Sequence, residues 1–305
     1  MEVFDLAVAK GMLNLNYARA CLNAKKHEII QSPAPTIREG MAESGAGLKV
    51  LKWLISSGTA NNNNFLKDAR FAQILMEYLV AEGLQEVCWK WIQRGFKSIP
   101  QYFATADSMR QKELRRDIVG PLYFLVKAEA SGDVSLDSAY ICLSRAVGYL
   151  KGCPATRMRD LLSHSGWFLV NQTTQQHSQR PPPTPSAFDS FFSLIPILSK
   201  NPAYQLAYLS LLHPSHPSAD LAFAFLQSLE PESSLTRVRD HNYAQLGLDT
   251  AKLLLENGRY EHADWVMEFL RERYGKQLGI SKRDQLEQAK AEASSLQLLE
   301  GLSLI

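Results

Sequence analysis

The stretch LLLENGRYEHADWVMEFL, residues 253–270, decides the fold class. After its central glycine, small or apolar side chains recur at the i, i+3, i+4 and i+7 positions of one helix face, namely Ala263, Val266, Met267 and Leu270. Gly258 permits the left-handed backbone conformation that ends a preceding helix. The stretch therefore predicts two helices joined by a tight turn.

The same helical period continues outward along the chain. A longer apolar face with spacing out to i+8 consists of Phe71, Ile74, Leu75, Tyr78 and Leu79. No run alternates with period two between turn residues, so the pattern predicts an all-α protein. The helices are expected near residues 3–29, 38–57, 66–82, 84–96, 108–131, 136–151, 155–171, 186–199, 202–212, 218–229, 240–257, 260–274 and 282–300.

One polar and proline-rich segment interrupts this pattern. Residues 171–186 read NQTTQQHSQRPPPTPS, and polyproline is stiff but has no internal hydrogen bonds. We expect an N-terminal helical-repeat region over residues 1–170, a linker or long loop over 171–186, and a C-terminal helical-repeat region over 187–305. A recognition motif for a proline-binding module is an alternative interpretation of the segment.

A turn glycine followed by an alanine recurs at hairpins. Gly132 with Ala139 forms one set, and Gly258, Tyr260 and Ala263 form another. In the repeat interpretation, the alanine lets two helices approach closely, and the apolar residue three positions before it pins the turn. For each of these residues taken singly, ordinary packing is the favoured interpretation.

The second set resembles a tetratricopeptide repeat, and YLVAEGLQEVCWKWIQRGFKS, residues 78–98, resembles a pentatricopeptide hairpin. This resemblance implies an irregular α-solenoid of antiparallel helical hairpins. Both families are scaffolds with many partners, so the resemblance implies binding rather than catalysis.

The overall charge of +2 conceals a local concentration of basic residues. Residues 88–127 hold eight basic and three acidic side chains. The predicted surface for RNA or an acidic partner consists of Lys90, Arg94, Lys97, Arg110, Lys112, Arg115 and Arg116. Interleaved aromatics such as Trp89 and Phe96 would suit stacking on single-stranded RNA. The alternative is an aromatic core with a solvated basic rim, which the helical spacing favours because Trp91 lies on a different face from Lys90 and Arg94.

Motifs for catalysis or cofactor binding are missing from the sequence. SGAGLK, residues 44–49, is similar to a phosphate loop, but Ala46 stands where that loop needs lysine. His213 and His216 are separated by Pro214, which prevents a helix from placing them on one face. We therefore expect no catalytic, cofactor-binding or metal-ligating residues, no cofactor, and no enzymatic activity.

Cysteine usage and hydropathy bear on the cellular compartment and on whether the chain spans a membrane. Four cysteines are scattered with no CxxC pair, which favours a reducing, intracellular compartment, either cytoplasmic or mitochondrial. No apolar run approaches the ~18 residues of a membrane span. Glu2 and Asp5 precede any basic residue, unlike a targeting peptide.

The expected function is a non-catalytic scaffold that binds protein partners or assembles a complex. The alternative is an RNA-binding pentatricopeptide-like factor in organellar, mitochondrial, gene expression. RNA binding would require Arg94, Lys97, Arg115 and Arg116 to converge on one groove, because phosphate contacts follow a continuous backbone.

Overall fold

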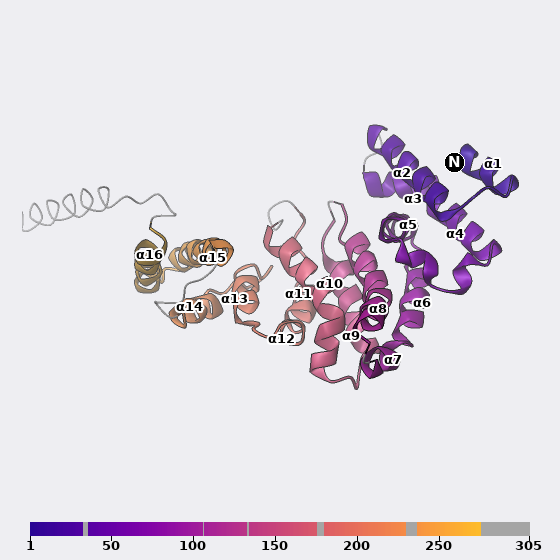
Figure 1. The fold of residues 1–305 in the computed structure, drawn as a ribbon. Helices are drawn as coiled ribbons and strands as arrows, with labels where there is room; N and C mark the ends of the chain where they lie inside the picture. Colours follow the sequence, from indigo (N-terminus) through magenta and orange to yellow (C-terminus); the bar gives the residue numbers. More distant parts are fainter. Residues whose placement is uncertain (33–35, 106, 133, 176–179, 230–236, 276–305) are drawn as a thin grey trace, which may run out of the picture. The chain divides into compact units, whose positions relative to one another are not determined.

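The computed structural model describes residues 1–32, 36–105, 107–132, 134–175, 180–229 and 237–275. These residues are helical with no strand among them, as the periodicity predicts (Figure 1). The chain divides into two compact units, Met1–Pro202 and Ala203–Ile305.

The first unit contains most of the helices. They are α1 (Glu2–Ala9), α2 (Leu15–Gln31), α3 (Ile37–Ser44), α4 (Ala46–Ser56), α5 (Ala69–Ala81), α6 (Gln85–Phe96), α7 (Ile99–Ala104), α8 (Ser108–Glu129), α9 (Asp137–Tyr149), α10 (Ala155–Gln175), α11 (Pro185–Phe192) and α12 (Ile195–Leu198). Two short 3₁₀ helices, η1 (Thr59–Asn61) and η2 (Asn64–Lys67), connect α4 to α5.

Helices α2, α5, α8 and α10 pack in succession, each against the next (Figure 1). Helix α6 packs against α5 and α8, and α9 packs against α8, α10 and α11. Ion pairs connect neighbours in the first series. Lys26 Nζ lies 2.6 Å from Glu77 Oε2 between α2 and α5, and Arg115 Nε lies 3.2 Å from Asp160 Oδ1 between α8 and α10.

Side-chain caps and glycines set the helix ends. Asp68 accepts hydrogen bonds from the backbone N–H groups of Arg70 and Phe71 at the start of α5, and Asp107 does the same at the start of α8. Gly132 adopts a φ of +88°, the left-handed conformation that ends the turn after α8.

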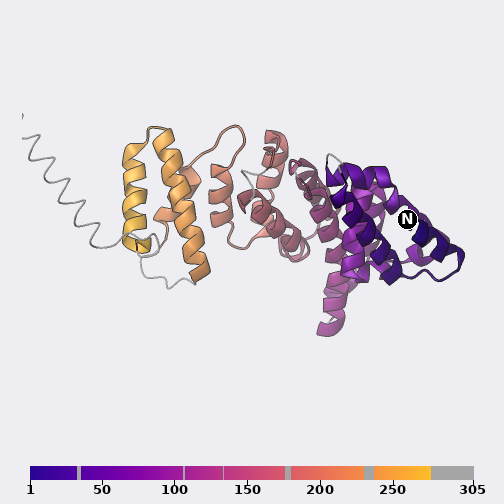
Figure 2. The same cartoon turned by 90° about the horizontal axis from the view of Figure 1, so that it is seen from above.

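The second unit contains α13 (Ala203–Leu211), α14 (Asp220–Gln227), α15 (Arg237–Glu256) and α16 (Tyr260–Tyr274). Figure 2 shows α15 and α16 side by side in orange and yellow. Their turn contains Gly258 with a φ of +70°. Gly247 of α15 faces Leu270 of α16 so closely that an added Cβ would lie 2.6 Å from Leu270 Cδ2. Close packing therefore depends on the missing side chain.

The residues assigned to repeat packing differ in their burial. Ala139 and Ala263 are fully buried, and Leu136, three residues before Ala139, is also buried. Tyr260, the matching residue before Ala263, is 65% exposed. The prediction that Tyr260 pins its turn is therefore wrong. It is the first residue of α16, and most of its side chain faces solvent.

Several predicted helix boundaries need correction. The helix expected over 3–29 is divided into α1 and α2 near Gly11, and that over 38–57 is divided into α3 and α4 at Gly45; both glycines have positive φ values. Residues 99–104 form α7, which was not predicted, and the helix expected over 186–199 is divided into α11 and α12. The helix expected over 282–300 lies outside the described residues.

The expected linker over 171–186 is also partly helical. Helix α10 continues to Gln175, and α11 begins at Pro185. The boundary between the two compact units falls at Pro202. Residues 180–186 therefore belong to the first unit rather than connecting two units.

Candidate functional site

The seven basic residues expected to form a binding surface come from two parts of the first unit. Lys90 and Arg94 lie on α6, Lys97 follows it, and the other four lie on α8. Arg94 Nη1 donates to the Ala60 carbonyl at 2.8 Å and to Asn63 Oδ1 at 3.3 Å. This arginine therefore holds the connection between α4 and α5.

Arg115 has a different neighbour. Its Nε donates to Asp160 Oδ1 at 3.2 Å and its Nη2 to the Asp160 carbonyl at 3.1 Å, both on α10. Tyr102 of α7 also donates its hydroxyl to Asp160, and burial raises the pKa of Tyr102 to about 12. Arg94 and Arg115 thus bind different parts of the first unit, the α4–α5 connection and α10.

The remaining basic residues are exposed. Arg110 pairs with Glu113 at 3.4 Å within α8, and Arg116 lies 3.9 Å from Asp117. Lys90, Lys97 and Lys112 are exposed to solvent. The basic residues therefore divide into structural arginines and a solvated rim.

The aromatic residues interleaved with them are mostly core. Trp89, Trp91 and Tyr102 are buried, and Trp91 contacts Phe65 edge to face with ring centroids 5.0 Å apart. A ring enclosed in this way has no open face for a base. The interpretation as a core with a basic rim accounts for these contacts.

A different aromatic cluster lies on the surface, between α8 and α10. The Tyr123 ring of α8 lies 4.3 Å from the His164 ring and 5.7 Å from the Phe168 ring, both of α10 (centroid distances). Trp167, on the same side of α10, is 45% exposed. Tyr123 and Phe168 are half-buried and His164 is exposed. We call these four residues the aromatic surface.

Basic side chains continue the aromatic surface along α8. Lys112, Arg116 and Tyr123 are separated by four and seven residues, so they lie on one side of that helix. The Arg116 side chain is 61% exposed. An apolar surface bordered by positive charge is therefore available to a partner.

Sequence reasoning did not find the aromatic surface. Tyr123 and His164 are 41 residues apart, and their helices become neighbours only through folding. The available signal was Trp167, a large apolar residue beside the apolar stripe of Leu162, Leu169 and Val170 rather than within it.

The phosphate-loop-like stretch is occupied by the protein's own carboxylate. Glu82 Oε1 accepts the Gly47 N–H at 2.7 Å, and Glu82 Oε2 accepts the Leu48 N–H at 2.6 Å, at the start of α4. Burial raises the pKa of Glu82, although the two backbone hydrogen bonds act in the opposite direction. The helix N-terminus that could attract a phosphate is thus already satisfied.

Side chains of the types that ligate metals, and thiols that could react, lie in the described ranges of the fold. No group of three His, Cys, Asp or Glu side chains there is placed to hold a metal ion. His213 and His216 stack with ring centroids 3.9 Å apart in a turn. The four cysteines are free thiols, and burial raises the pKa of Cys88 to about 12, which suppresses the nucleophilic thiolate.

Across the same ranges, every helix is too short or too polar to span a bilayer. Comparisons with protein-family models, curated proteins and solved structures found no match.

Proposed function

We propose that the chain is a non-catalytic helical scaffold, an α-solenoid of antiparallel hairpins, that binds a protein partner through the aromatic surface on α8 and α10. The observation that carries this proposal is the exposure of Trp167 beside the Tyr123–His164–Phe168 cluster. Tryptophan and tyrosine supply most of the binding energy at many protein interfaces. A surface of this kind costs solvation free energy when it faces water.

The basic side chains beside the aromatic surface indicate the charge that a partner would carry. Lys112 and Arg116 lie on the same side of α8 as Tyr123, so an approaching segment meets positive charge and then aromatic rings. This order suits an acidic peptide segment that carries apolar side chains. The charges would steer its encounter and the rings would hold it.

The stacking of helices supports the repeat architecture. Helices α2, α5, α8 and α10 each contact the next, and each is followed by a helix or helices that pack beside it. Solenoid proteins bind partners along surfaces formed by consecutive repeats, and α8 and α10, which carry the aromatic surface, are consecutive in this series.

The second candidate function is RNA binding. The exposed basic side chains Lys90, Lys97, Lys112 and Arg116 favour it, because neutralised phosphates dominate the affinity of such complexes. The burial of Trp89 and Trp91 and the internal contacts of Arg94 and Arg115 weigh against it.

The test is affinity purification of the tagged full chain from its native cells, with and without nuclease. Trp167→Ala and Ile141→Ala form a matched pair, since Ile141 of α9 is 58% exposed and lies outside the aromatic surface. We expect one protein partner that resists nuclease, binds the Ile141→Ala variant, and is recovered at least about tenfold less with Trp167→Ala.

Two outcomes would contradict this function. Equal recovery by both variants would exclude the aromatic surface as the binding site. Loss of every partner on nuclease treatment, together with weaker RNA binding by Arg116→Ala and a steep decline with salt, would establish the RNA function instead.

A further inference from the structure

The segment RPPPTP, residues 180–185, has a regular pattern of exposure. Arg180 and Pro183 are half-buried, whereas Pro181, Pro182, Thr184 and Pro185 are exposed. One half-buried position is thus followed by two exposed ones, twice in succession. A polyproline II helix has three residues per turn, so residues i and i+3 lie on the same edge. The exposure therefore has the period of that helix.

The backbone and its contacts agree with this conformation. Thr184 has φ −66° and ψ 143°, close to ideal polyproline II values. At one end, Arg180 donates from Nη1 to the Ala130 carbonyl at 2.5 Å and from Nη2 to Gln172 Oε1 at 3.1 Å. At the other end, the Thr184 N–H donates to Asp137 Oδ1 at 2.8 Å.

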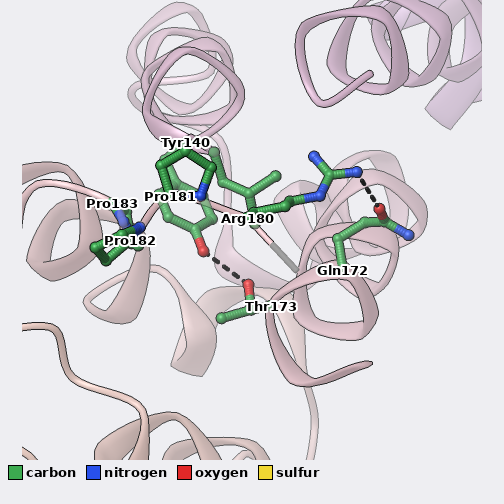
Figure 3. Close-up of a pocket in the computed structure, with 8 residues that line it drawn as sticks. Tyr140, Gln172, Thr173, Arg180, Pro181, Pro182 and Pro183 are labelled. Carbon is green, nitrogen blue, oxygen red and sulfur yellow. Dashed lines mark hydrogen bonds between the residues drawn. The ribbon is translucent and has the colours of Figure 1, made fainter. Parts of the chain in front are cut away.

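The inward edge of the segment lies against the first unit. Figure 3 shows the three consecutive prolines beside Tyr140, with Arg180 reaching Gln172. Tyr140 is fully buried and its hydroxyl shares a hydrogen bond with Thr173 Oγ1 at 2.7 Å. A fixed platform thus supports the segment, and we call residues 180–185 the proline strap.

We propose that the proline strap is a ligand for a proline-recognition domain, one whose groove is lined by aromatic side chains. Its two outward edges are Pro181 with Thr184 and Pro182 with Pro185. The second edge is a PxxP pair, the spacing that such grooves accommodate, and its Pro185 is also the first residue of α11. The third edge, Arg180 with Pro183, faces the rest of the first unit. The two edges that carry the exposed prolines therefore remain accessible to a partner.

Attachment at both ends favours this interaction. A free peptide loses conformational entropy when it binds, whereas the strap is already held extended by Arg180 and Thr184. Because Arg180 donates to Ala130 and Gln172, its charge is directed inward. The strap therefore suits domains that read proline edges rather than a flanking cation.

The test uses the full chain and a panel of purified SH3, WW and EVH1 domains immobilised for biolayer interferometry. The variant is Pro182→Ala/Pro185→Ala, which removes one outward edge. The control is Pro217→Ala, an exposed proline in a turn of the second unit. Thermal unfolding of all three proteins checks that the fold is retained.

We expect saturable binding to at least one domain, about tenfold or more weaker for the double variant and unchanged for the control. The proposal is overturned if no domain on the panel binds the wild-type chain. It is also overturned if the domain that binds does so equally well with the double variant. Neither result bears on the aromatic surface, which lies on α8 and α10.

Discussion

Replacing Gly47 by alanine should destabilise the first unit, although alanine is the better helix former. Gly47 is buried in the first turn of α4, and an added Cβ would lie 2.8 Å from Tyr78 Cβ. Tyr78 cannot move away, since it is fully buried and its hydroxyl donates to the Leu22 carbonyl at 3.1 Å. The same Cβ would lie 3.0 Å and 3.1 Å from the carboxylate oxygens of Glu82.

The magnitude follows from three contributions. Overpacking against Tyr78 costs about 1–3 kcal/mol. Displacing Glu82 weakens two hydrogen bonds from backbone N–H groups to a carboxylate, each worth about 1.5–3 kcal/mol. Alanine regains up to about 1 kcal/mol of helix propensity. Because the carboxylate can shift and keep part of each bond, these two bonds lose about 2 kcal/mol together, and the expected net loss is about 2–4 kcal/mol.

Gly148→Ala is the matched control. Gly148 lies in α9, and an added Cβ would meet nothing within 4 Å. The same substitution should therefore stabilise the protein by up to about 1 kcal/mol. The two variants are expected to shift stability in opposite directions.

Urea unfolding followed by tryptophan fluorescence measures the difference. Four of the five tryptophans, Trp53, Trp89, Trp91 and Trp167, lie in the first unit, so the signal reports mainly on that unit. We expect the Gly47→Ala midpoint to fall by about 1 M. A midpoint equal to that of Gly148→Ala would refute the reasoning about close approach.

Three further outcomes are expected. Burial raises the pKa of Glu129, and its Oε2 has no hydrogen bond, with Arg38 Nη2 3.8 Å away. The folded state therefore favours the protonated carboxyl, and this contribution to stability is lost as pH rises through the raised pKa. As pH rises from about 4, the ordinary pKa of a glutamate, Glu129→Gln should gain stability relative to wild type in urea midpoints, and a difference that stays constant with pH would contradict this. Gly247→Ala should lower the free energy of unfolding of the second unit by about 1–3 kcal/mol, because the added Cβ would meet Leu270. Urea unfolding followed by circular dichroism measures this loss, and an unchanged urea midpoint would contradict the prediction. Finally, the thiol of Cys88, whose pKa burial raises to about 12, should be alkylated by iodoacetamide at pH 8 only after unfolding; peptide mass spectrometry that finds it labelled in the folded chain would contradict its burial.

Helical periodicity was sufficient to predict the helix class and much of the core. The stripe that begins at Phe71 and ends at Leu79 is buried along α5. Local pattern could not locate the breaks at Gly11 and Gly45, because a single glycine is tolerated in a helix and costs only about 1 kcal/mol. Tertiary contacts decide those positions. The hydrogen bonds that Glu82 accepts from the N–H groups at the start of α4 are one example, since donor and acceptor are 35 and 34 residues apart.

The basic surface was only partly predictable for a related reason. Charge density along the sequence identifies where arginines are concentrated but not which neighbour each one contacts. Arg94 finds its acceptors 31 and 34 residues earlier, and Arg115 finds Asp160 45 residues later. The aromatic surface could not be predicted for the same reason, because its members come from α8 and α10 and lie about 40 residues apart in the sequence. Function on a helical scaffold therefore has to be located from neighbouring helices rather than from motifs.

For the proline strap, the local sequence predicts the stiffness of the backbone but not its attachment to the first unit. Stiffness follows from composition, because proline fixes φ near −65°. Composition alone cannot distinguish a spacer between units from a segment held on one unit. The distinguishing evidence is the anchoring of Arg180 and Thr184, to helices α8, α9 and α10 that precede the strap. A spacer between units would not have every third residue half-buried. A polyproline helix that packs on a folded unit does, because one of its three edges faces that unit. The remaining two edges are then presented to solvent in a fixed geometry, which is the condition for recognition without an ordering cost.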